Sequence, residues 1–141
     1  MQTKTIVHKV AGRTYSVEVP TVERVPGEVG IAAAVALAAD AAVAAAVAEG
    51  PPSAAGFVFI RRALGLTAAR LGELLGVRAE TISRWENEAA AFDRTDWLAL
   101  GDLALERAGR PPAALARMEA LADGKQPPKQ IRVELSMLPS V

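Results

Sequence analysis

Cysteine is absent from this chain of 141 residues, and histidine occurs once, as His8. Without cysteine the chain forms no disulfide and offers no thiolate to a metal, and a single histidine builds no imidazole cluster. The sequence therefore predicts no metal site, no structural zinc and no cofactor. The length leaves room for one compact domain, or for a small domain with a modest appended module, but not for a large catalytic domain.

The sequence also lacks recognisable groups of catalytic residues. No nucleophile–base pair, phosphate-binding glycine loop or carboxylate pair stands out, so we expect that the protein is not an enzyme. There is also no basic start followed by an apolar run and a small-residue cleavage site, and we therefore expect a cytoplasmic protein.

The chain also has no net charge, because 16 lysines and arginines balance 16 acidic residues. Neutrality is unusual for a nucleic-acid binder, since neutralisation of phosphates supplies most of the non-specific affinity. Residues 56–88, however, carry five arginines against four glutamates, a local excess of one positive charge. Arginine is the residue best suited to bidentate contacts with guanine and phosphate. Any DNA binding would depend on a few well-placed groups.

The N-terminal third of the chain predicts a hairpin and a helix. Apolar and polar residues alternate over 3–10 and again over 14–19, as in a β-hairpin. Pro20, Pro26, Gly27 and Gly30 are expected to break any regular element. An alanine-rich helix then covers 31–49, with Ile31, Val35, Val43 and Val47 in one narrow stripe.

That apolar tract invites a membrane interpretation, which we reject. Asp40 lies at its centre, alanine is only weakly apolar, and neither flank carries a cluster of lysine or arginine. The run Gly50-Pro51-Pro52-Ser53 ends the helix and predicts a boundary near residues 49–55. We divide the chain into an N-terminal module, 1–52, and a second part, 53–141.

The second part predicts four or five short helices. Thr95 is placed to cap a helix that runs to Leu105, and another helix is expected at about 113–122. Residues 130–135 alternate as a strand does, and this strand needs a partner, which the N-terminal hairpin or a second subunit could supply. The predicted fold is thus mainly α, with a small β-hairpin plus helix module and a C-terminal strand.

The most informative stretch is 66–87, where residue types fall at the positions that two steeply crossing helices demand. Gly72 sits where the helices come closest, and Gly76 suits a tight turn with positive φ. Thr67 is placed as the cap of the first helix. The wedge between the helices is filled by larger apolar residues, namely Leu71, Leu75, Val77, Ile82 and Trp85.

From Gly56 to Asn87 the chain resembles the Cro/repressor (Xre-type) helix-turn-helix family, ending in Thr81-Ile82-Ser83-Arg84-Trp85-Glu86-Asn87. The resemblance implies a five-helix domain and a transcriptional regulator, usually a repressor, that binds double-stranded DNA. It implies that Arg61 pairs with Glu86 as a structural lock. It further implies base reading from the second helix of the motif, by Ala79, Glu80, Ser83 and Arg84, and phosphate contacts from Arg62, Thr67, Arg70 and Arg78. Arg70 can equally form a surface ion pair with Glu73.

Three residues depart from the family pattern. Ala68 replaces the polar residue, usually glutamine, that touches the DNA backbone. Arg78 replaces a capping serine or threonine, although it can reach a phosphate. Glu88 replaces a glycine, so a left-handed turn there is strained or gives way to a longer helix. We expect these changes to lower affinity more than they threaten the fold.

The order of hairpin, helix and helix-turn-helix is also similar to MqsA-type antitoxins, on residues 10–15, 19–24 and 57–62. In that family the N-terminal part binds zinc and a toxin, and the C-terminal part dimerises and represses its own operon. The zinc cysteines are missing here, which puts toxin binding in doubt.

We also expect a homodimer on a palindromic operator, because one short recognition helix reads only a few base pairs. The segments after residue 94, including 130–135, are the expected interface. The alternative is a protein-interaction module, an antitoxin remnant that no longer binds DNA.

Overall fold

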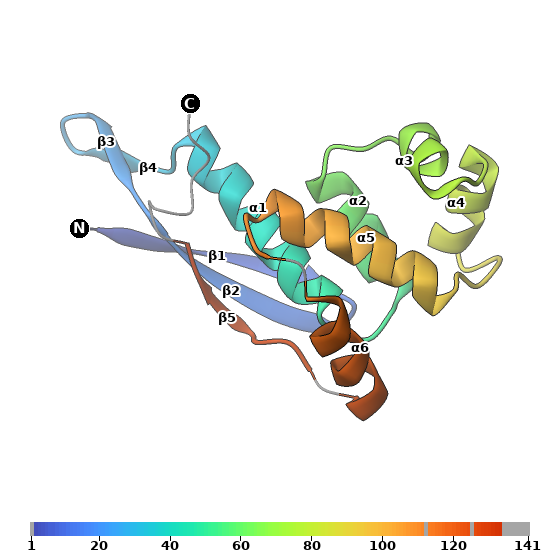
Figure 1. The fold of residues 1–141 in the computed structure, drawn as a ribbon. Coiled ribbons are helices and arrows are strands. Elements are labelled where there is room, and N and C mark those ends of the chain that lie inside the picture. Colours follow the sequence, from blue (N-terminus) through green and yellow to red (C-terminus); the bar gives the residue numbers. More distant parts are fainter. Residues whose placement is uncertain (1, 112, 125, 134–141) are drawn as a thin grey trace.

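The computed structural model describes residues 2–111, 113–124 and 126–133 (Figure 1). The predicted hairpin is present, with β1 (Thr3–Val10) antiparallel to β2 (Arg13–Pro20). Its turn residues, Ala11 and Gly12, have φ of 53° and 75°. Two positive φ values mark a type I′ turn, whose twist matches that of the strands.

A second hairpin follows where we expected no regular element, so that expectation is wrong. β3 (Val22–Val25) pairs with β4 (Glu28–Gly30). Pro26 and Gly27 form the turn between the two strands, and Gly27 supplies the positive φ, 87°, that the turn needs. The Gly27 N–H also donates to Glu23 Oε1 at 2.8 Å. Turn residues thus joined two short strands here and did not end the regular structure.

The predicted alanine-rich helix is α1 (Ala33–Ala48), which lies across one face of the sheet (Figure 1). Val35, Val43 and Val47 of the predicted stripe are buried. Burial in its second half extends around the helix, because α1 packs against β2, α2 and α5 together. No helix in the described part of the chain is long and apolar enough to cross a membrane.

The predicted C-terminal strand is β5 (Gln130–Arg132), which pairs in parallel with β2. The sheet order is β1-β2-β5, so the strand finds its partner within the same chain. Residues 134 and 135 of the predicted strand lie outside the described residues.

Five helices follow residue 53 in the described ranges, which confirms a mainly α fold with a five-helix second part. They are α2 (Ala54–Ala63), α3 (Ala68–Leu75), α4 (Ala79–Glu86), α5 (Arg94–Arg107) and α6 (Ala114–Asp123). The start predicted for α5 is wrong. The helix begins after Asp93, because Asp93 and Asp96 form a capping box at its start and Thr95 lies within the first turn. In this box the Asp93 backbone N–H donates to Asp96 Oδ2 at 3.3 Å.

One hydrophobic core joins the residues on both sides of position 52. Val17 and Val43 from the first part contact the same cluster as Phe57, Ile60 and Ile82 from the second, and all five are fully buried. The helices α2 and α4 therefore rest on a platform that the N-terminal segment helps to build.

α6 is attached through a buried arginine. Arg117 is 3% exposed and donates to the Leu98 carbonyl at 3.0 Å and to Asp102 Oδ1 at 2.6 Å. Burial lowers the pKa of Arg117, and the charge of Asp102 opposes that shift. Gly101 leaves the space that this guanidinium occupies. The outer face of α6 exposes Leu115 and Met118.

Candidate nucleic-acid interface

α3 and α4 meet as two short helices joined by a tight turn. A Cβ at Gly72 would lie 2.6 Å from the carbonyl oxygen of Val77, so only glycine fits at this crossing. Gly76 ends α3 in the left-handed conformation with φ of 75°, and the Val77 N–H donates back to the Gly72 carbonyl at 2.8 Å. Both glycines therefore have the roles that the sequence predicted.

The inner side of α4 is anchored in the core. Ile82 is fully buried and Trp85 is 7% exposed. The indole of Trp85 meets Phe57 edge-on at 5.8 Å and Phe92 at 6.1 Å between ring centroids. Aromatic pairs of this geometry stabilise a packing arrangement beyond their burial. Sequence analysis did not identify Phe92 as a core residue. Aromatic residues are few in this chain, so an aromatic side chain close to the helix-turn-helix could have been expected to join its core.

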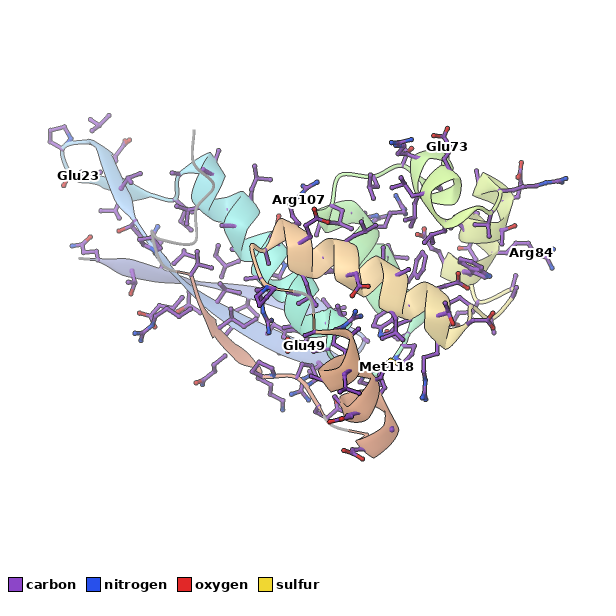
Figure 2. All side chains as sticks on the ribbon, in the orientation of Figure 1. Glu23, Glu49, Glu73, Arg84, Arg107 and Met118 are labelled. Carbon is purple, nitrogen blue, oxygen red and sulfur yellow. The ribbon has the colours of Figure 1, made fainter. Side chains whose placement is uncertain are left out.

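The opposite side of α4 faces solvent. Glu80, Ser83 and Arg84 are exposed, whereas Ala79 is half-buried. Figure 2 shows Arg84 at the periphery of the molecule, directed away from the other helices. Among the described residues, no ion pair involves Arg84 or Glu80, so both side chains are free to meet a ligand.

A two-pronged ion pair fixes α2 to the end of α4. Arg61 Nε and Nη2 donate to the Glu86 carboxylate at 2.6 and 2.9 Å, and Arg61 Nη1 donates to the Leu66 carbonyl at 2.9 Å. The two side chains are only 15% and 12% exposed. The hydrogen bonds to Glu86 raise the pKa of Arg61. One guanidinium thus holds α2, the loop before α3 and the last turn of α4 together.

Two of the candidate phosphate contacts lie at helix starts. Thr67 caps α3, and its Oγ1 accepts the Arg70 N–H at 3.0 Å. Arg78 stands at the N-cap of α4, is exposed and makes no capping bond with its side chain. Backbone N–H groups at such termini favour anions, which is the chemistry of a DNA phosphate.

The other two candidates have different surroundings. Arg70 forms an exposed pair with Glu73 at 2.8 Å, the surface interaction that the sequence left open. Arg62 is exposed on α2 and borders an open hollow of about 370 Å³, which His8 and Asp40 also line.

His8 has two partners in the structure. Its Nε2 lies 3.2 Å from Asp40 Oδ1, and its ring meets Phe59 edge-on at 5.4 Å. Asp40 belongs to α1 and Phe59 to α2, and the spacing of these residues in the sequence does not predict that they lie beside β1.

Glu88 adopts the left-handed conformation after α4, with φ of 59°. The chain therefore has a left-handed turn here, as the resemblance implied, with the strain that a residue bearing a Cβ incurs, and α4 is not extended. The Ala89 N–H closes the turn onto the Arg84 carbonyl at 2.8 Å.

In the described ranges, no group of three or more histidine, cysteine or acidic residues is arranged to hold a metal ion. A family model described as Helix-turn-helix matches residues 59–100, which include α3, α4 and the first half of α5. This match supports the helix-turn-helix part of the resemblance. No match was found among curated proteins or among solved structures. The narrower similarity to MqsA-type antitoxins finds no support in these comparisons.

Proposed function

We propose that this protein is a sequence-specific DNA-binding transcriptional repressor whose α4 enters the major groove. The observation that supports this most strongly is the division of α4 into two sides. Ile82 and Trp85 fasten one side to the core, while Glu80, Ser83 and Arg84 leave the other side polar and exposed. A short exposed helix on a rigid support is the element that reads base edges in helix-turn-helix proteins.

Arg84 is the main base-reading residue in this proposal. It lies four residues after Glu80 and so one turn along the same face of α4. An unpaired guanidinium can donate two hydrogen bonds to O6 and N7 of guanine. Glu80 can accept from a cytosine amino group, Ser83 adds a hydroxyl, and Ala79 offers a small apolar contact to a thymine methyl group.

Phosphate contacts from Arg62, Thr67, Arg70 and Arg78 would set the position of α4. Thr67 is neutral, so the three arginines carry the salt dependence. Two chains would then present six cations, which corresponds to a slope of log K against log salt of about −5. Arg70 can contact a phosphate only if its exposed ion pair with Glu73 breaks, which costs less than about 1 kcal/mol.

A homodimer completes the proposal. One copy of α4 covers only a few base pairs, and two copies related by a two-fold axis would read half-sites about one helical turn apart. A toxin partner is not included, because only the antitoxin similarity implied one.

The competing function is a protein-interaction module that has lost DNA binding, which Ala68 and the zero net charge favour. Selection of bound fragments from random or genomic duplex DNA separates the two. The proposal predicts an enriched inverted repeat whose binding weakens as salt rises, with Arg62→Ala making the slope shallower by about 2 for a dimer. Recovery of no enriched sequence, with no salt-dependent binding, would refute the proposal and favour the interaction module instead.

A further inference from the structure

The outer edge of β1 carries a row of backbone groups that bond to nothing in the described part of the chain. β1 is the terminal strand of the order β1-β2-β5 (Figure 1). On β2, the N–H of Ser16 and the carbonyl of Glu18 bond toward β5, at 2.8 and 3.0 Å. The odd-numbered residues of β2 therefore bond toward β1.

The register between the strands then fixes which groups of β1 are free. Because Tyr15 and Val17 oppose His8 and Ile6, the even-numbered residues of β1 use their N–H and carbonyl groups within the hairpin. The free groups belong to the odd-numbered residues, which also have exposed side chains. These are Thr3, Thr5, Val7 and Lys9.

This edge has few of the features that usually prevent strands from pairing, although Lys4 and Lys9 place two positive charges on the strand. β1 is eight residues long, contains no proline, and keeps an unbroken register with β2 without a bulge. By contrast β5, at the other edge, has three residues, and the β3–β4 hairpin has an irregular register. A long, regular and exposed edge is a site for the addition of a further strand.

The edge is complementary to itself in one antiparallel register. With Ile6 on a two-fold axis, Thr5 opposes Val7 of a second copy and Thr3 opposes Lys9, so all four free N–H groups of each strand find a carbonyl. Lys4 then faces His8 of the second copy, and no lysine opposes a lysine. Val7, which is 59% exposed, gains the β-branched Thr5 of the second copy as its direct neighbour.

We infer that two copies of this chain pair through β1 in this register and form a continuous six-stranded sheet. A two-fold contact of this kind closes on itself and leaves no free long edge. The interface differs from the segments after residue 94 that the sequence suggested, since β5 is already paired within its own sheet. The inference rests on the homodimer in the proposed function but needs no DNA.

Sedimentation of the full chain without DNA tests the pairing. We expect a mass of twice 14.7 kDa at tens of micromolar. Thr5→Lys combined with Val7→Lys places like charges opposite each other twice and should weaken the dimer at least about tenfold. Thr5→Lys combined with Val7→Glu alters the same two exposed sites but restores opposite charges, and should retain the dimer.

Met118→Lys, at an exposed site on α6 away from β1, is the control for an added lysine and should leave the mass unchanged. Circular dichroism should be the same for all variants, because no substituted side chain is in the core. A wild-type monomer, a double-lysine variant as dimeric as wild type, or a Lys/Glu variant as weak as the double lysine would each overturn the inference. Binding to DNA is scored separately, so failure here leaves the assignment of α4 intact.

Discussion

The Arg61–Glu86 pair offers the sharpest test of how the helix-turn-helix is held together. Substitution of Arg61 by methionine keeps most of the volume but leaves the Glu86 carboxylate, only 12% exposed, without its cation. It also removes the donor to the Leu66 carbonyl. Loss of one partner from a buried pair costs about 3–5 kcal/mol, and partial exposure reduces this to about 2–3 kcal/mol here. Since a domain is stable by only about 5–15 kcal/mol, the effect is easily measured.

The reverse change is expected to be milder. In Glu86→Met the guanidinium of Arg61 keeps the Leu66 carbonyl and can turn toward water, so we expect a loss of about 2 kcal/mol. The double variant replaces both charges by apolar groups of similar volume. It should be no less stable than Arg61→Met alone, because no uncompensated charge remains.

Urea denaturation of the wild type, both single variants and the double variant gives the coupling energy. We expect about 2 kcal/mol, with single-variant melting temperatures lower by about 4–10 °C. If the double variant loses as much free energy of unfolding as the two single variants together, to within about 0.5 kcal/mol, the pair does not lock α2 to α4.

Three further changes test other contacts by thermal or urea unfolding. Gly72→Ala should destabilise by about 1–2 kcal/mol despite better helix propensity, because the Val77 carbonyl is backbone and cannot move aside; unchanged stability would mean that the helices do not cross there. Glu88→Gly should stabilise by about 0.5–1 kcal/mol by relieving the left-handed turn, and a loss of stability would argue against that strain. Arg117→Met should cost about 2 kcal/mol by removing the hydrogen bonds to the Leu98 and Ala48 carbonyls and the ion pair with Asp102, and a neutral effect would show that α6 is held by other contacts.

Local patterns in the sequence predicted much of this fold because they depend on near neighbours. The first hairpin follows from strict alternation on either side of Ala11-Gly12-Arg13, although the turn proved one residue shorter because Arg13 belongs to β2. α1 follows from the run of alanines. Gly72 and Gly76 could be assigned because a close crossing and a positive φ each leave little choice of residue. The base-reading and phosphate assignments remain predictions, since they concern contacts with a molecule that is not part of the fold.

Contacts between distant segments could not be predicted in the same way. The pairing of His8 with Asp40 depends on how α1 lies on the sheet, and the burial of Arg117 depends on the space above Gly101. The β3–β4 hairpin was missed because proline and glycine were interpreted as ending regular structure, when they supplied a turn between two short strands. Tertiary packing decided the first two outcomes, whereas the third was a local turn that was misinterpreted.

The proposal that α4 reads bases is tested most directly by the affinity of Arg84→Ala for the selected operator. Arg132→Ala, an exposed arginine on β5, serves as the control, and each protein is titrated against the operator and against a duplex with the candidate guanine replaced. We predict that Arg84→Ala weakens operator binding by about 10- to 100-fold per half-site and loses its preference over the altered duplex, while the control matches wild type. If Arg84→Ala binds as tightly as wild type with the same preference, α4 does not read DNA through this residue, and the interaction module becomes the better account.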